Sequence, residues 1–270
     1  MRYDAASPVP PEPMSLAPPI TPSSQVIDVL RERGHAVLGR EGLCERVGVS
    51  AAELEALRGT WDDLPPDAYL RDGGRYRSRR HSCFVVEDAH VTAVPHRAHW
   101  QPVEYNALHG GLERWFEPMT PAIVGQPVWP RLLAGLAACC SALKGPQRWY
   151  VEAHQFRIDT TDGIGRPTPE GAHRDGVDFV AVVFVGREGI KGGETRVFEA
   201  QGPHGIRFTL TEPWSTLLLD DERVIHESTP IQPLDGRGYR DTLVLTFRAQ
   251  GFQGPAASPG NLTPDEALPR

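Results

Sequence analysis

The amino-acid sequence predicts a mainly β fold with flanking helices. Runs of apolar, β-branched and aromatic residues at 177–185, 217–229 and 241–247 are typical of buried strands. The run at 149–158 alternates between two faces and is expected to be the first strand of the core. Because all these runs lie in the C-terminal half of the chain, the β core is expected from about residue 149.

Helices are expected ahead of the core and beside it. Residues 25–34 carry apolar side chains at helical spacing, with Ser24 as a possible N-cap and Gly34 as a C-cap. Residues 50–58 begin with a Ser-x-x-Glu pattern that is typical of a capping box. Residues 129–143 form an amphipathic pattern, which predicts a helix packed on the outer face of the sheet.

The remaining segments complete a single-domain organisation. Residues 1–24 are rich in Pro and Ser and are expected to be a disordered arm, and residues 251–270 are expected to be a flexible tail. Between them, 25–250 is predicted to be one domain. Within it, a short strand is expected at 35–38 and a loop followed by a helix at 96–116.

Composition excludes several classes of function. The chain has 270 residues, 40% of them hydrophobic, and a net charge of −7, which argues against non-specific binding of nucleic acid. Its four cysteines show no zinc-binding spacing, and reduced thiols packed as small apolar residues are expected. With no signal-peptide pattern and no apolar run of membrane-spanning length, a cytoplasmic enzyme, monomeric or homodimeric, is expected.

Candidate metal ligands lie on both sides of the strand at 177–185 in the sequence. His173 and Asp175 are two residues apart, so an extended chain presents both on one face. His226 lies among apolar residues of a second strand-like run. Two imidazoles and one carboxylate on adjacent strands form the facial triad of non-haem Fe(II) oxygenases. Three protein ligands leave three positions of an octahedron for a bidentate co-substrate and O2.

A candidate anion site follows the triad. Arg240 and Thr242 open the strand-like run that ends at Phe247, and their spacing places both on one face. A guanidinium group binds a carboxylate through two hydrogen bonds, and a hydroxyl group can add a third. 2-Oxoglutarate has such a distal carboxylate at one end and a keto-acid group that chelates iron at the other.

These segments resemble one family of enzymes. The sequences HRD, GGET, TLLLDDERVIHESTPI, YRDTLVLTF and WYVEAHQFRI are similar to those of the Fe(II)/2-oxoglutarate dioxygenases that include bacterial isoleucine dioxygenase and related free amino acid hydroxylases. The resemblance extends from about residue 73 to 247. It implies a double-stranded β-helix (jelly-roll, cupin-like) core and the use of Fe(II), 2-oxoglutarate and O2.

The resemblance also implies a reaction. It indicates hydroxylation of a free, aliphatic L-amino acid or a close derivative, with release of succinate and CO2. Related halogenases replace the triad carboxylate with a small residue, so Asp175 favours hydroxylation. Desaturation, epoxidation and sulfoxidation on the same triad stay open.

Further polar residues are candidates for binding the small molecules. On the strand at 149–158, Gln155 and Arg157 are predicted to point inward, Gln155 toward 2-oxoglutarate and Arg157 toward the substrate. The same strand would place His154 on the opposite face, away from the metal. The substrate carboxylate is expected to meet arginines, and the candidates besides Arg157 are Arg77, Arg80 and Arg174.

Other interpretations remain beside this one. Taken singly, each His, Asp or Arg of the site could be an ordinary structural or surface residue. The same iron chemistry could act on a peptide or on a carrier-tethered residue. A zinc hydrolase or cupin-type isomerase could use two His and one Asp, but Arg240 and Thr242 would then have no role. A non-enzymatic jelly-roll binding module, or an oxygen or 2-oxoglutarate sensor, would need no turnover of a small substrate.

Overall fold

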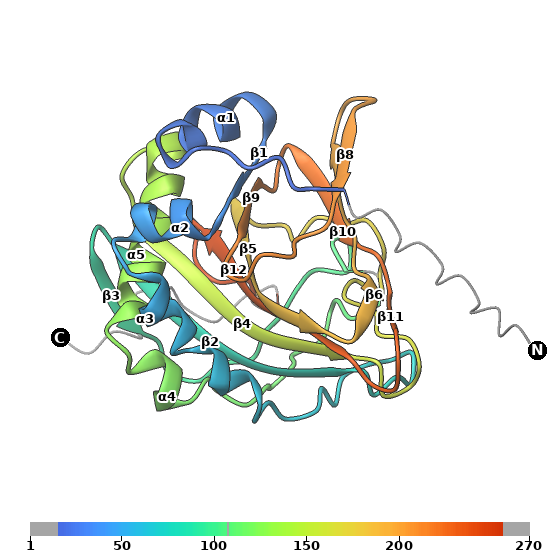
Figure 1. Ribbon diagram of the computed structural model, residues 1–270. Coiled ribbons are helices and arrows are strands. Elements are labelled where there is room, and N and C mark those ends of the chain that lie inside the picture. Colours follow the sequence, from blue (N-terminus) through green and yellow to red (C-terminus); the bar gives the residue numbers. More distant parts are fainter. Residues whose placement is uncertain (1–15, 107, 256–270) are drawn as a thin grey trace, which may run out of the picture.

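The computed structural model describes residues 16–106 and 108–255, and its architecture is two facing β layers with helices against one of them (Figure 1). The large layer has seven strands in the order β1-β9-β5-β12-β4-β2-β3, and its pairings are antiparallel. Its strands are β1 (His35–Leu38), β2 (Arg77–Glu87), β3 (His90–Ala93), β4 (Trp149–Asp159), β5 (Phe179–Glu188), β9 (Thr216–Asp220) and β12 (Tyr239–Arg248).

The facing layer consists of two smaller sheets. One is ordered β10-β7-β8 and the other β11-β6. Their strands are β6 (Ile190–Gly192), β7 (Thr195–Glu199), β8 (Gly205–Phe208), β10 (Val224–Ser228) and β11 (Ile231–Pro233). Two layers of antiparallel strands around a common interior are the architecture of a jelly roll, or double-stranded β-helix. The predicted mainly β fold with a jelly-roll core and flanking helices is therefore confirmed.

The helices cover the outer face of the large sheet (Figure 1). They are α1 (Val26–Arg33), α2 (Arg40–Val47), α3 (Ala51–Glu55), α4 (Pro121–Val124), α5 (Val128–Lys144) and the 3-10 turns η1 (Ser23–Gln25) and η2 (Arg58–Trp61). Trp129 and Leu136 of α5 pack in one apolar core with Val151 of β4 and Leu245 of β12. None of the helices in the described part of the chain combines the length and apolar character that a membrane span needs.

Alternation along the strands separates the outer core from the interior. In β12, Leu243, Leu245 and Phe247 pack toward the helices, whereas Arg240 and Thr242 face the interior pocket. The interior also holds its own apolar cluster, which includes Val180, Phe184, Val197, Phe208 and Leu217. The outer face of the large sheet therefore anchors the helices, and its inner face carries polar groups.

Several elements match the sequence patterns and two do not. Gly34 ends α1 with φ 74°, and Ser50 and Glu53 form the expected capping box of α3. The predicted N-cap role of Ser24 is wrong, because Ser24 lies inside η1. The helix expected in 96–116 is also wrong, because the described residues there form turns tied by the His99–Arg114 bridge.

The strand-like run at 217–229 divides into two strands. Its first part is β9 in the large sheet, and its second part is β10 in the facing layer. The polar residues Asp221, Glu222 and Arg223 form the turn between them. This division has a functional consequence, because it carries His226 across the interior to the layer opposite β12.

The terminal segments are described only in part. Most of the predicted N-terminal arm lies outside the described residues, but its end is bound to the domain, since the Thr21 amide donates to the Val37 carbonyl at 2.7 Å. At the other end, the structure describes the predicted tail as far as Pro255. There Gln253 is buried and donates its side-chain amide to the Gly176 carbonyl at 2.7 Å.

A glycine in α5 allows this helix to approach α2 closely. A Cβ atom added at Gly135 would lie 2.8 Å from the Val47 Cα. Helix propensity alone favours Ala over Gly by about 1 kcal/mol, but overpacking against backbone costs about 1–3 kcal/mol. We therefore expect Gly135→Ala to lower the free energy of unfolding in a denaturant titration. As a control, Gly59→Ala adds its methyl group where no atom lies within 4 Å. An increase in stability for Gly135→Ala would contradict this account of the packing.

Candidate active site

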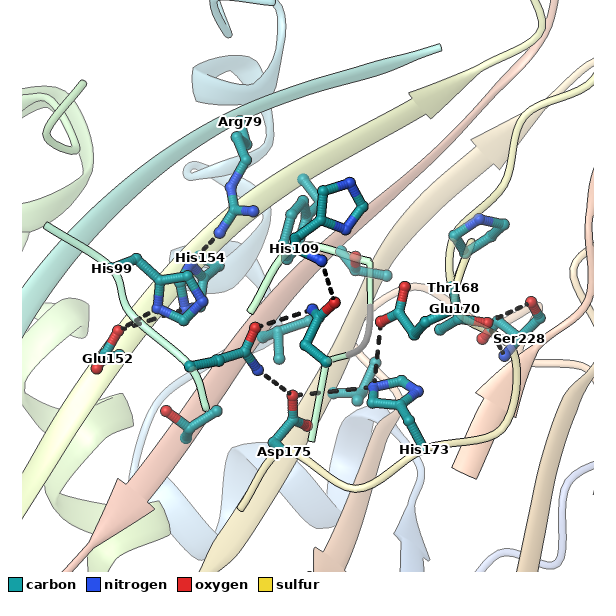
Figure 2. Close-up of a pocket in the computed structure, with 18 of the residues that line it drawn as sticks. Arg79, His99, His109, Glu152, His154, Thr168, Glu170, His173, Asp175 and Ser228 are labelled. Atoms are coloured by element: carbon teal, nitrogen blue, oxygen red, sulfur yellow. Dashed lines mark hydrogen bonds and ion pairs between the residues drawn. The ribbon is translucent and has the colours of Figure 1, made fainter. Parts of the chain in front are cut away.

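An interior pocket between the two layers brings together residues that are far apart in the sequence. Its lining includes His173 and Asp175 from the segment before β5, His226 from β10, and Arg240 and Thr242 from β12. The predicted metal site and the predicted anion site therefore share one cavity. Figure 2 shows His173 and Asp175 on one side of it.

Backbone pairing places the two imidazoles side by side. His173 and His226 form an isolated antiparallel bridge, and each amide donates to the other's carbonyl at 3.0 Å. Their ring centroids lie 4.6 Å apart. The His173 Nε2 atom is 3.8 Å from Asp175 Oδ1, and the His226 Nε2 atom is 3.8 Å from Asp175 Oδ2. These separations exceed hydrogen-bond length and leave space for an ion among the three groups.

The tautomers suit metal binding. His173 Nδ1 lies 3.0 Å from the Gly171 carbonyl and donates to it, so Nε2 is the ring nitrogen that faces Asp175. Burial lowers the pKa of His226 well below its ordinary value, so this ring is neutral. A neutral imidazole with an open Nε2 is the form that a metal ion binds.

Asp175 is held by a polar chain from the 96–116 segment. Gln101 Nε2 donates to Asp175 Oδ1 at 3.2 Å. Gln101 Oε1 accepts from Asn106 Nδ2 at 3.1 Å and from Arg114 Nη2 at 2.8 Å. Because the arginine is purely a donor, it fixes which end of the Gln101 amide faces the carboxylate. Apart from the polarity of Gln101 and Asn106, no sequence pattern indicates this role.

A second carboxylate braces the same segment. Asp221 accepts from the amides of Asp175, Gly176 and Val177 at 3.0, 2.8 and 3.1 Å. Burial and the neighbouring charge of Asp175 raise the pKa of Asp221 to about 7. Two carboxylates buried next to each other favour a cation between or beside them. The donor set and its charge therefore fit a divalent metal ion.

Arg240 is a buried cation without an anionic partner. It is 4% exposed, and its Cζ atom lies 5.8 Å from the centroid of the Phe184 ring. Among the described residues, no carboxylate lies within ion-pair distance of it. Burial, followed by the charge of Arg187, lowers the pKa of Arg240 to about 10, so it remains protonated at neutral pH. An uncompensated guanidinium inside a protein favours binding of an anion.

The predicted inward positions on β4 are wrong. Gln155 faces outward, where its Nε2 donates to Thr60 Oγ1 at 2.9 Å. Arg157 also faces outward and pairs with Asp241 at 2.7 Å and Asp62 at 3.0 Å. The expectation assumed that the polar positions of the strand mark its inner face. In the structure η2 and the following loop supply polar partners on the outer face, so polarity does not distinguish the two sides.

The candidate substrate arginines lie in different places. Arg77 lines the pocket, but it is paired with Asp67 at 2.7 Å. Arg80 faces outward and donates to Glu117 at 3.1 Å. Arg174 donates to the Glu222 carbonyl at 3.1 Å and lies over Tyr105, outside this pocket. Alternation along β2 explains the first two, because neighbouring residues of a strand point to opposite faces.

The opposite end of the pocket carries a second His/Glu group. It consists of His81, His99, Glu152 and His154. One potential metal-ligating atom from each residue, a ring nitrogen or a carboxylate oxygen, lies within 4.8 Å of those of the others. The predicted placement of His154 on the far face is therefore wrong, since it lines the same pocket as the triad (Figure 2). The residue still lies apart from His173 and Asp175 in that view.

Hydrogen bonds account for this second group. Glu152 Oε2 accepts from His99 Nδ1 at 2.6 Å and from His81 Nε2 at 2.9 Å. His154 Nδ1 accepts from Arg79 at 2.6 Å. Burial lowers the pKa of His99 to about 3, so the ring is neutral and its Nε2 is an acceptor. With Glu152 Oε2 engaged twice and a guanidinium adjacent, we interpret this group as a hydrogen-bonded wall and the triad as the metal centre.

The contact between Gln101 and Asp175 predicts an effect on metal affinity. Substitution of a residue that orients a metal ligand typically weakens binding 10–100-fold. We expect Gln101→Leu to weaken Co(II) binding about tenfold in a spectroscopic titration, because Asp175 loses the hydrogen bond that holds its side chain. Gln155→Leu removes a similar amide from the outer face and should leave the affinity unchanged. Equal affinities of both variants and the unmodified protein would refute this role of Gln101.

Comparisons with known proteins place the chain in a family. The family model described as 2OG-Fe dioxygenase matches residues 58–246. A bsmA homolog from Methylobium petroleophilum PM1 is 54% identical, with a TM-score of 0.84 over 88% of this chain and 97% of that one. IDO from Bacillus thuringiensis is 15% identical, with a TM-score of 0.68 over 84% and 99%. The Fe(II)/(alpha)ketoglutarate-dependent dioxygenase TqaL is 18% identical, with a TM-score of 0.65 over 84% and 86%.

The two more distant structures share the fold, and no curated protein matches the chain. The family model covers most of the chain, and the Methylobium protein matches over nearly its whole length. This chain therefore belongs to the 2OG-Fe dioxygenase family, which uses Fe(II), 2-oxoglutarate and O2.

Proposed function

We propose that this protein hydroxylates a free, aliphatic L-amino acid or a close derivative, with release of succinate and CO2. The proposal rests on the observation that a cluster of possible metal ligands and a buried cation line the same pocket. These are the His173–Asp175–His226 cluster and the unpaired Arg240 guanidinium. The family supplies the class of chemistry, and the assignment of residues to roles is our own.

In this proposal, His173 and His226 bind Fe(II) through Nε2, and Asp175 binds it through its carboxylate. Arg240 and Thr242 bind the distal carboxylate of 2-oxoglutarate, because a buried cation gains most from an anion that it can contact directly. Bound at this site, Fe(II) with 2-oxoglutarate and O2 supplies the oxidant for attack on an unactivated C–H bond.

The protein itself contributes orientation and a dry environment. Gln101 and Asp221 hold the segment that carries Asp175. Phe156, Val182 and Val244 form an apolar part of a pocket lining that is otherwise mostly polar. A cavity with an apolar part among polar groups suits a small molecule that has an aliphatic part and charged ends.

The alternative functions explain fewer of the contacts. A zinc hydrolase or a cupin-type isomerase would use the triad but would leave Arg240 buried without an anion. A non-enzymatic binding module would leave the bridged pair of histidines beside Asp175 without a purpose. Iron chemistry on a peptide or a carrier-tethered residue uses the same metal site, and it differs only in the substrate end of the pocket.

Succinate release from 2-oxoglutarate tests the proposal. Purified protein with Fe(II) and ascorbate is assayed against free L-amino acids that include valine, leucine and isoleucine. We expect succinate in excess of the substrate-free rate with at least one of them, and a mass increase of that amino acid by one oxygen atom. His173→Ala should lose iron binding and turnover together. No stimulation by any amino acid would refute the amino acid assignment.

Arg240→Gln tests the assignment of the anion site. Loss of a charge-assisted hydrogen bond costs about 1.5–3 kcal/mol, so we expect the KM for 2-oxoglutarate to rise at least tenfold. Iron affinity should stay within about twofold, because Arg240 is not a metal ligand. The control is Arg80→Gln, which removes the same charge from a position that faces away from the pocket. An unchanged KM in Arg240→Gln would show that another residue binds the co-substrate.

A further inference from the structure

The pocket contains two kinds of arginine. Arg77, Arg79, Arg114 and Arg240 all line it. Asp67 pairs with Arg77 at 2.7 Å and with Arg79 at 3.7 Å, and Arg79 also donates to His154. The first two arginines therefore share one buried carboxylate, which contacts both of them.

Arg114 is not compensated in this way. Its side chain donates Nη2 to Gln101 Oε1, which is a neutral acceptor, and its buried Nε atom has no hydrogen-bond partner. Within residues 16–106 and 108–255, no carboxylate lies within 4 Å of its guanidinium nitrogens. The residue is 2% exposed. Burial and the charge of Arg77 lower its pKa to about 10, so it remains a cation at neutral pH.

Two uncompensated guanidinium groups therefore face one cavity. The proposed function assigns Arg240 to the distal carboxylate of 2-oxoglutarate, which leaves Arg114 without an anion. A buried unpaired charge is costly to the folded protein. The simplest arrangement that satisfies both cations is a second anionic ligand, bound at the same time as 2-oxoglutarate.

The position of Arg114 sets where that ligand lies. Gln101 bridges Arg114 and Asp175, with bonds of 2.8 Å to the former and 3.2 Å to the latter. An anion on Arg114 is therefore held one side chain away from the metal ligand. Glu170 also lines the pocket, and its Oε1 atom lies 3.5 Å from His173 Nε2. A positive group and a negative group thus flank the space beside the triad, which suits the two ends of an amino acid.

We propose that Arg114 binds the free α-carboxylate of the substrate and thereby selects free amino acids over peptides, amides and carrier-tethered residues. This inference rests on the proposed function. The guanidinium offers its remaining N–H donors to the two carboxylate oxygens, as arginine does in bidentate pairs. An amide or thioester carries no negative charge at this position and leaves the guanidinium uncompensated.

Matched ligand pairs test the inference. The probes are L-valine, L-leucine and L-isoleucine and their C-terminal amides. They are titrated calorimetrically under anaerobic conditions into protein loaded with Co(II) and 2-oxoglutarate, and they are also assayed for succinate release. In the unmodified protein we expect the free acid to bind at least tenfold more tightly than its amide, given about 1.5–3 kcal/mol for a charged hydrogen bond. Arg114→Gln should weaken acid binding at least tenfold and leave amide binding within about twofold.

Three controls separate this role from a structural one. Arg114→Lys keeps the charge and should restore part of the preference for the acid. Arg80→Gln, on the outer face of β2, should retain the full preference. Because Gln101 links Arg114 to Asp175, the Co(II) affinity of Arg114→Gln is measured as well and should fall by less than that of Gln101→Leu. The KM for 2-oxoglutarate should change by less than about threefold.

The outcomes are distinguishable. If an amino acid is hydroxylated but its amide binds and turns over equally well, the proposed function stands and the role of Arg114 is refuted. If Arg114→Gln raises the KM for 2-oxoglutarate instead of weakening acid binding, Arg114 is an anchor for the co-substrate and the inference is wrong. If no amino acid stimulates succinate release, the proposed function fails and this inference fails with it.

Discussion

The backbone bridge between His173 and His226 is the interaction on which the site depends. One partner precedes β5 of the large sheet, and the other lies on β10 of the facing layer. Their paired hydrogen bonds of 3.0 Å tie the segment before β5 to β10. The same pairing sets the imidazoles 4.6 Å apart, because paired residues of an antiparallel bridge project their side chains in the same direction. The three side chains of the candidate metal site therefore meet where the segment before β5 pairs with β10.

Charge burial explains the polar groups around this bridge. Asp175 and Asp221 lie close together inside the protein, and Asp221 is stabilised by three backbone amides rather than by a cationic side chain. Gln101 satisfies one oxygen of Asp175. The loop that contains Gln101 has no helix among its described residues, yet it supplies the hydrogen bond that holds Asp175, the proposed metal ligand. The arrangement is typical of a site in which rigid strands hold the ligands and a loop adjusts them.

Pairing also divides the polar residues of the pocket into supporting and binding groups. Arg77 and Arg79 share the carboxylate of Asp67, and Arg79 also donates to His154 beside the group around Glu152, so these residues contact one another along the pocket lining. Arg114 and Arg240 face the same space, and no carboxylate of the described residues lies within 4 Å of either guanidinium group. Since an ion pair has little to gain from a ligand, we propose that anionic ligands bind to Arg114 and Arg240, which have no ion-pair partner among the described residues.

Local sequence was enough to predict much of this protein. The strand patterns, the i, i+2 spacing of His173 with Asp175 and of Arg240 with Thr242, and the end of α1 at Gly34 all follow from periodicity and backbone preference. The reason is that these features depend on neighbours within a few residues. The pattern around His226 likewise predicts a strand, but it does not indicate that the run divides into β9 and β10.

Tertiary structure alone decided which face of each strand meets the pocket. Gln155, Arg157 and Arg80 are polar and lie on core strands, but helices, turns and loops on the outer side supply their partners. His154, which the alternation argument set aside, faces the cavity. Both faces of the sheet are covered, so polarity along a strand cannot tell inside from outside. Likewise, only the folded chain shows that Asp67 pairs with Arg77 and Arg79, whereas Arg114 remains without a carboxylate, because pairing depends on residues that are distant in sequence.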